Sequence, residues 1–139
     1  MSKRTGRLIS ILYRKGQIHL GKLLKSCNVG ASEFPVLLYL YHQDGVTQED
    51  LVAYMCLDKS AVARIIQSLL SKNYITKAKD SKDQRCNRIY ITPKGLKLKS
   101  EIEASLDAWH TILMKDFTDD EKAMTNTLLK RMVENIKGD

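Results

Sequence analysis

Residues 47–73 read TQEDLVAYMCLDKSAVARIIQSLLSKN, and they contain two short helical patterns with a capping signal in front of each. Thr47 and Asp50 have the spacing of a capping box, in which each side chain bonds the backbone amide of the other residue. Asp58 can cap the second helix in a similar way. Two short capped helices joined by a tight turn predict a helix-turn-helix.

The second of these helices has one apolar face and one polar face. The apolar side chains follow helical spacing and are predicted to be buried: Val62, Ile65, Ile66, Leu69 and Leu70. The opposite face carries small and hydrogen-bonding side chains and no carboxylate. A helix that enters the major groove of DNA must be slim and free of negative charge, with donors such as Arg and Gln directed at base edges. A solvated face that lacks acids has the same pattern, so this helix alone leaves both interpretations open.

Two strand-like runs follow the second helix. Asn73 stands where a left-handed residue often ends a helix. The runs YITKAK (74–79) and NRIYIT (87–92) then alternate in polarity with a period of two, which is typical of strands. The charged residues DSKDQRC (80–86) lie between them. These features predict a β-hairpin with a long charged tip, and therefore a winged helix-turn-helix.

Helical patterns also precede this core. Residues 7–26, RLISILYRKGQIHLGKLLKS, predict a first helix, which Gly16 and Gly21 weaken. One side of it would be lined by Leu8, Ile11, Leu12, Ile18, Leu23 and Leu24. Residues 32–45, SEFPVLLYLYHQDG, predict a second helix with Ser32 as N-cap, Pro35 in its first turn and Gly45 at its end.

Two more helices are predicted after the hairpin. Thr92 and Pro93 have the residue types of an N-cap and a first helical position, and they predict the start of one long helix. Its apolar stripe would consist of Leu96, Leu98, Ile102, Leu106, Trp109, Ile112 and Leu113 and end near Phe117. Thr118 and Glu121 form another capping box in front of a terminal helix. That helix carries Met124, Leu128, Met132 and Ile136 at a regular spacing.

The sequence as a whole predicts a mainly α protein with a small β-hairpin. Its 139 residues fit a single domain, residues 1–139, with a winged helix-turn-helix core at about 31–96. The helical flanks, residues 1–28 and 97–139, carry more apolar surface than one winged module needs. A two-fold homodimer would bury it and would set two recognition helices about 34–36 Å apart, one turn of DNA.

Charge and cysteine usage narrow the class of partner. The net charge of +7 and the pI of about 9.3 favour a polyanion. No apolar run approaches the roughly 18 residues of a membrane span, and the basic start has no cleavage site, so we expect a cytoplasmic protein without a membrane partner. Cys27, Cys56 and Cys86 form no C-x-x-C pair, which favours a reducing compartment and predicts no metal site and no cofactor. We expect Cys56 to pack in the core of the helix-turn-helix.

Residues 33–95, from EFPVLLYLYHQDG to the exit ITPKG, closely resemble the DNA-binding core of MarR-type (multiple antibiotic resistance) transcriptional regulators. The resemblance rests on the VTQEDL entry, on Arg64 in the second helix and on the D-x-R pattern of Asp83 and Arg85 in the wing. It covers about residues 31–96 in detail. One departure is Gln84, which stands where the family commonly has a first of two arginines.

The resemblance implies roles for individual residues. In the recognition helix it implies DNA contacts by Lys59, Ser60, Ala61, Arg64, Gln67 and Ser68. In the wing, Arg85 would enter the minor groove, and Asp83 would brace Arg85 or a basic side chain of the recognition helix. Phosphate contacts would come from Lys77, Lys79, Lys82 and Arg88. The partner implied is double-stranded DNA with a pseudo-palindromic operator, bound by a homodimeric regulator.

The same resemblance suggests repression that a small aromatic or phenolic ligand relieves. Position alone makes five residues candidates for such a pocket, with core packing as the alternative for each: Tyr13, His19, Tyr39, His42 and Trp109. A redox-sensing regulator is another possibility, because nearby cations on an exposed wing would lower the pKa of the Cys86 thiol. Cys86 could equally be an ordinary residue of a polar loop.

Other classes of function were weighed against DNA binding. An enzyme is not indicated, because His19, His42 and His110 stand apart and no nucleophile has a local catalytic signature. A winged module that docks proteins is the more serious rival, but a protein interface would not require a carboxylate-free recognition face. RNA binding is disfavoured since that face lacks stacking aromatic side chains.

Overall fold

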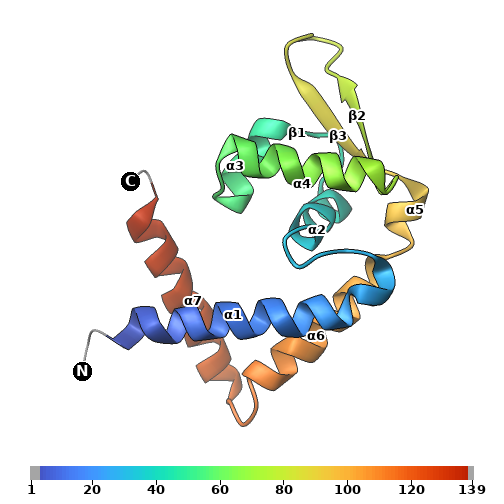
Figure 1. Ribbon diagram of the computed structural model, residues 1–139. Coiled ribbons are helices and arrows are strands. Elements are labelled where there is room, and N and C mark those ends of the chain that lie inside the picture. The colour runs from blue at the N-terminus through green and yellow to red at the C-terminus, as the bar shows by residue number, and fades with distance from the viewer. Residues whose placement is uncertain (1–3, 138–139) are drawn as a thin grey trace. The chain divides into compact units, whose positions relative to one another are not determined.

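The protein is described here by a computed structural model that covers residues 4–137. Its elements are α1 (Thr5–Leu23), the short 3₁₀ helix η2 (Lys25–Cys27), α2 (Phe34–His42), β1 (Val46–Thr47), α3 (Gln48–Met55), α4 (Lys59–Ser71), β2 (Ile75–Lys79), β3 (Asn87–Ile91), α5 (Pro93–Leu96), α6 (Lys99–Leu113) and α7 (Asp119–Ile136). The chain divides into two compact units between Leu106 and Asp107. The predicted class, mainly helical with a small β-hairpin, is confirmed (Figure 1).

The helix-turn-helix forms as its capping signals predict. Thr47 Oγ1 accepts a hydrogen bond from the amide of Asp50 at 3.1 Å, and Asp50 Oδ2 accepts one from the amide of Thr47 at 3.0 Å. Asp58 Oδ1 accepts a hydrogen bond from the amide of Ala61 at 2.7 Å and caps α4. Cys56 is an exception to the prediction, because it is exposed and ends α3 in a left-handed conformation with φ 53°.

The wing is a three-stranded antiparallel sheet in the order β1-β3-β2. Ile75 pairs with Ile91 across the predicted hairpin, and β1 adds a pair between Val46 and Ile89 on the other side of β3. Asn73 has φ 64°, as its position predicts. The two-residue strand β1 is too short to leave an alternating pattern and was not predicted. The β2–β3 hairpin extends well beyond α4 (Figure 1).

The core of the first unit lies where α2, α3, α4 and the sheet meet. The fully buried aliphatic side chains are Leu24, Val36, Leu37, Leu40, Leu51, Val62, Leu69, Ile75, Ile89 and Ile102. From the predicted apolar face of α4, Val62, Ile66 and Leu69 are buried, whereas Ile65 and Leu70 are half-buried. Because only one face of α4 packs against the core, the opposite face is exposed to solvent.

Three predicted features of the helices are wrong. Ser32 does not cap α2: Glu33 occupies that position and makes no capping bond to the helix, and α2 ends at His42 rather than at Gly45. The long helix predicted from Pro93 is instead two helices, α5 and α6. Tyr41 Oη donates a hydrogen bond to the Gly95 carbonyl at 2.7 Å, and the amide of Leu98 bonds the same carbonyl at 3.2 Å, which ends α5 after one turn. Thr92 caps α5, as predicted.

The flanking helices expose much of their apolar surface. In α1, which is continuous through Gly16 and Gly21, the apolar side chains Leu8, Leu12 and Ile18 are each more than half exposed. In α7, which the Thr118–Glu121 capping box opens as predicted, no residue is buried. The flanks predicted to dimerise are residues 1–28 and 97–139. Of these, residues 1–3 and 138–139 lie outside the described residues. Over residues 4–137, every helix is too short or too polar to cross a membrane.

Candidate nucleic-acid interface

The exposed face of α4 has the chemistry expected of a DNA-reading helix. Lys59, Ser60, Arg64 and Gln67 are exposed, and Ala61 is half-buried at the rim. α4 contains no acidic residue, and the carboxylate of Asp58 at its start is occupied by the Ala61 amide. Donors without competing carboxylates can therefore reach base edges and phosphates from this face. Ser68 differs, because its hydroxyl donates inward to Glu33 Oε2 at 2.7 Å.

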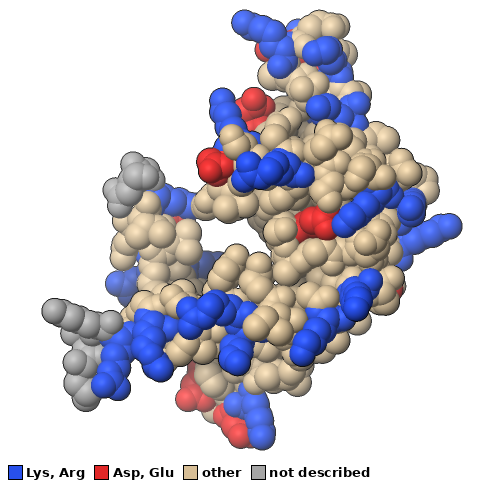
Figure 2. All heavy atoms as spheres, in the orientation of Figure 1, with Lys and Arg blue, Asp and Glu red and all other residues tan. Residues whose placement is uncertain are grey.

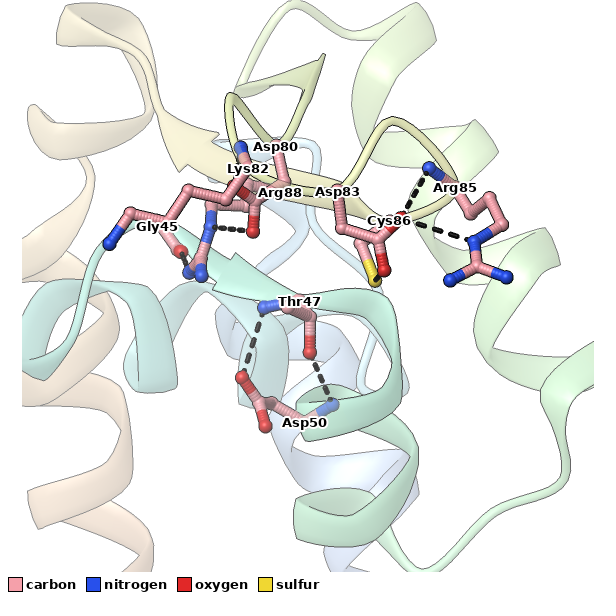
Figure 3. Close-up of polar contacts among 9 residues, drawn as sticks. All are labelled: Gly45, Thr47, Asp50, Asp80, Lys82, Asp83, Arg85, Cys86 and Arg88. Carbon is pink, nitrogen blue, oxygen red and sulfur yellow. Dashed lines mark hydrogen bonds and ion pairs between the residues drawn. The ribbon is translucent and has the colours of Figure 1, made fainter.

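Arg85 stands at the tip of the wing and is held by Asp83. Asp83 Oδ1 accepts one hydrogen bond from the Arg85 amide at 3.0 Å and another from Arg85 Nε at 3.2 Å (Figure 3). The same two bonds lower the pKa of Asp83, so the carboxylate is charged at neutral pH. The Arg85 side chain is 92% exposed and keeps both terminal nitrogens available. Of the two predicted partners for Asp83, the structure has Arg85.

The other basic side chains of the wing fall into two groups. Lys77 and Lys82 are exposed, whereas Lys79 Nζ donates to the Gln84 carbonyl at 3.1 Å. Arg88 is only half-exposed, and its guanidinium donates to Asp80 Oδ2 at 3.1 Å and to the Gly45 carbonyl at 2.6 Å (Figure 3). Arg88 therefore links the wing to the loop before β1. This link was not predicted from the sequence.

Positive charge gathers where these elements are exposed. Figure 2 shows Lys and Arg side chains clustered over the far end of the hairpin, and a further row of them along α1. No acidic residue precedes Glu33 in the chain, which explains why the row on α1 is unbroken. The net charge of +7 is therefore spread over the surface, and the wing holds only a part of it.

Cys86 does not have the environment that redox sensing would need. Partial burial, the charge of Asp83 and a 3.7 Å hydrogen bond from the thiol to Asp83 Oδ2 raise its pKa. The sequence-based expectation that neighbouring cations lower this pKa is wrong, since the nearest charge is a carboxylate and the Arg85 guanidinium is already paired with it. The thiolate, which is the reactive form, is correspondingly disfavoured.

Of the five predicted pocket residues, Tyr13 and Tyr39 lie at one groove of the first unit. Tyr13 lines a groove of about 540 Å³ between α1, α2 and α3, together with Gln17, Ala31, Ser32, Phe34, Pro35, Tyr54, Met55 and Leu57. Tyr39 contacts this group from the side, with its ring centroid 4.4 Å from that of Tyr54. His19 is half-buried on α1, His42 is exposed, and Trp109 belongs to the second unit.

A second hollow lies between these groove residues and the exposed face of α4. It measures about 500 Å³ and is lined by Tyr13, Ser32, Glu33, Leu57, Ala61, Arg64, Ile65 and Ser68. Tyr54, Phe34 and Leu57 were not singled out from the sequence, because aromatic and aliphatic residues at helical spacing look like ordinary core.

Within residues 4–137, no three His, Cys, Asp or Glu side chains are grouped as a metal site would need.

Comparison with known proteins agrees with this arrangement. The model of the MarR family matches residues 29–87. The crystal structure of a MarR transcriptional regulator from Methanosarcina mazei Go1 is 40% identical, covers 94% of each chain and superposes with a TM-score of 0.85. This chain belongs to the MarR family.

Two further MarR proteins are similar to this chain, and one of them was crystallised with DNA. The crystal structure of a mutant MarR from E. coli complexed with operator DNA is 25% identical, covers 94% of each chain and has a TM-score of 0.84. The multiple antibiotic resistance protein MarR of Salmonella typhimurium is 27% identical over 129 residues, which are 92% of this chain and 90% of that protein. As a MarR-family member, the protein is a DNA-binding transcriptional regulator and not an enzyme.

Proposed function

We propose that the protein is a homodimeric repressor that binds a pseudo-palindromic duplex operator. The observation that carries this proposal is the exposed, carboxylate-free face of α4 beside a wing whose Arg85 is held outward by Asp83. Lys59, Ser60, Ala61, Arg64 and Gln67 would contact the major groove, and Arg85 the adjacent minor groove. Lys77, Lys79 and Lys82 would contact phosphates.

The dimer is proposed from the apolar surface that one chain leaves exposed. Leu8 and Leu12 on α1, and Met124 and Ile136 on α7, are each more than half exposed, which is unfavourable for a soluble protein unless a partner covers them. We propose that residues 1–28 and 97–139 form the dimerisation regions and that residues of about 31–96 form the DNA-binding core. Together they would make a single domain, residues 1–139. Two copies of α4 about 34–36 Å apart would then reach successive major grooves. We also propose a cytoplasmic location, where a regulator would meet its operator.

Relief of repression by a small aromatic ligand has support from the groove at Tyr13. Its lining is mainly apolar, with the Tyr13 and Tyr54 rings available for stacking, and the neighbouring hollow reaches Arg64. A ligand acts as an inducer only if it binds the DNA-incompetent state more tightly than the competent one. Cys86 does not favour the redox alternative, for the reasons given above.

The experiment that tests this function begins with selection from a random duplex pool at near-physiological salt. The selected site is then titrated against a scrambled duplex of the same length. We expect an enriched pseudo-palindrome with half-sites one turn apart, bound on the order of 10³-fold more tightly than scrambled DNA. Weak, steeply salt-dependent binding to every duplex would reject sequence recognition and favour a winged module that docks acidic proteins.

A further inference from the structure

Glu33 is the one charged residue in the buried class among residues 4–137, with 6% of its surface exposed. It precedes α2, on the side of the first unit where α4 ends. A buried carboxylate is unfavourable unless several donors replace its lost water. The partners that satisfy Glu33 therefore indicate what the residue holds in place.

Three donors from two parts of the chain converge on this carboxylate. Oε1 accepts from the Gly30 amide at 2.8 Å and from Lys72 Nζ at 2.7 Å, and Oε2 accepts from the Ser68 hydroxyl at 2.7 Å. Burial alone would raise the pKa of Glu33, but the hydrogen bonds from Lys72, Ser68 and Gly30 outweigh it and lower the pKa. The carboxylate is therefore charged at neutral pH and bonds both the loop before α2 and the C-terminal half of α4.

The two α4 donors lie in one row with the predicted base-reading arginine. Arg64, Ser68 and Lys72 are spaced by four residues, so their side chains leave α4 from the same side, one turn after another. Ser68 and Lys72 end on Glu33, whereas Arg64 is exposed. A rotation of α4 about its axis that redirected Arg64 would have to break both bonds to Glu33.

The apolar contacts of α4 are less directional than these bonds. Val62, Ile66 and Leu69 are buried on the other face, and hydrophobic burial as such has no preferred direction. Hydrogen bonds to a charged carboxylate are short and directional, and they fix the rotation. Lys94 Nζ, which donates to the Lys72 carbonyl at 3.0 Å, holds the end of the same helix.

We infer that Glu33 is a positioning residue for sequence recognition: by binding Ser68 and Lys72 it fixes the rotation of α4, and so the direction in which Arg64 meets the bases. The inference rests on the proposed function, since it assumes that α4 reads a specific duplex. Glu33 itself touches no DNA in this role. It acts through α4, by its bonds to Ser68 and Lys72.

The sign of the effect separates this role from simple electrostatics. Glu33→Gln removes one negative charge, which by charge alone strengthens binding to any duplex. A positioning role predicts the opposite for the operator, because a Gln side chain has one acceptor oxygen instead of two and no charge, so its bonds to Ser68 and Lys72 differ in direction and are weaker. Glu49→Gln is the control for charge, since it also removes one negative charge, but from an exposed residue in the first turn of α3 that is neither a proposed DNA contact nor in a proposed dimerisation region.

The experiment titrates the full-length wild type and both variants with the selected operator and with scrambled DNA, after urea unfolding has shown that each is folded. For Glu33→Gln we expect at least a tenfold loss on the operator and less than a twofold change on scrambled DNA. Glu49→Gln should weaken neither. Unchanged operator affinity, or equal losses on both duplexes, would overturn the inference. A wild type that does not prefer the operator would overturn the proposed function and the inference with it.

Ser68→Ala tests the same contact from the side of α4 and leaves the Lys72–Glu33 pair intact. We expect a three- to tenfold loss on the operator alone. Combining Ser68→Ala with Glu33→Gln should cost no more than Glu33→Gln, because both substitutions remove the same bond. Additive losses would instead mean that Ser68 contacts DNA independently, and would overturn its assignment to Glu33. If Glu33→Gln does not fold, Ser68→Ala still tests the inference, because an unchanged operator affinity of that variant would overturn it.

Discussion

Asp83 Oδ1 accepts hydrogen bonds from both the amide and the Nε of Arg85, at 3.0 and 3.2 Å, while the Arg85 side chain is 92% exposed. An acid at the tip of a DNA-binding wing opposes its phosphate partners by charge alone. Its contacts explain its presence, because they preset the direction of a long flexible side chain before DNA arrives. Presetting lowers the conformational entropy lost on binding.

Replacing either residue of this pair should weaken operator binding. Arg85→Ala is expected to cost roughly tenfold, about 1.4 kcal/mol, with the largest loss on operators with A·T-rich flanks, where the minor groove is narrow. Asp83→Ala should also weaken binding although it removes a negative charge. Fluorescence anisotropy with A·T-rich and G·C-rich flanks measures both. Unchanged affinity of Arg85→Ala on A·T-rich flanks would remove the wing tip from the interface.

Lys77 and Lys82 are expected to contribute affinity without sequence preference. Each is exposed on the wing, and a lysine–phosphate contact releases condensed counterions. Alanine at either position should weaken operator and scrambled DNA equally and lower the slope of log K against log salt by about 1. A salt titration from low to physiological ionic strength measures this slope. If the slope does not change, the lysine does not contact a phosphate.

Alanine substitutions at Gly95 and Gly21 should change the free energy of unfolding in opposite directions. A Cβ on Gly95 would lie 2.3 Å from the Tyr74 carbonyl oxygen, so Gly95→Ala forces α5 away from the hairpin and should cost about 1–3 kcal/mol of unfolding free energy. A Cβ on Gly21 meets nothing within 4 Å, and Gly21→Ala should stabilise α1 by about 0.5–1 kcal/mol. Urea denaturation measures both. Equal effects of the two substitutions would contradict the close packing of α5.

Leu128 tests the apolar face of α7 as a dimer contact. The residue is 40% exposed, and no residue of α7 is buried, so Leu128→Asp should leave each chain folded but place a charge in the proposed interface. Sedimentation should then show monomers, and affinity for the full palindrome should fall to that of a half-site. Thr127→Asp, on the neighbouring exposed position, adds the same charge and should remain dimeric. A Leu128→Asp protein that stays dimeric would exclude α7 from the interface.

The features that the sequence predicted correctly are mostly local. The Thr47–Asp50 and Thr118–Glu121 capping boxes each involve residues three apart, and the period-two runs around the wing need only a hairpin to pair. The Asp83–Arg85 bond, which the family resemblance implied as one of two alternatives, also joins residues only two apart. Short-range chemistry leaves a recognisable spacing in the chain, and these elements could therefore be placed before any coordinates were known.

The features that the sequence did not reveal depend on distant partners. Tyr41 bonds the Gly95 carbonyl of α5, 54 residues away, and Glu33 meets Ser68 35 residues later. Arg88 was predicted as a phosphate contact, and the sequence did not reveal that its guanidinium also donates to the Gly45 carbonyl, 43 residues away. Such contacts leave no periodic signal, because each partner separately looks like an ordinary polar residue.

The central claim is that the exposed face of α4 reads base sequence, and Arg64→Ala tests it most directly. The measurement is the affinity of wild type and variant for the selected operator and for scrambled duplex at one salt concentration. A bidentate arginine–guanine contact predicts a loss of about 1–3 kcal/mol on the operator, with little change on scrambled DNA and a relaxed preference at one base pair of each half-site. Equal losses on both duplexes would mean that Arg64 supplies only charge, and would contradict the account of α4 as the recognition helix.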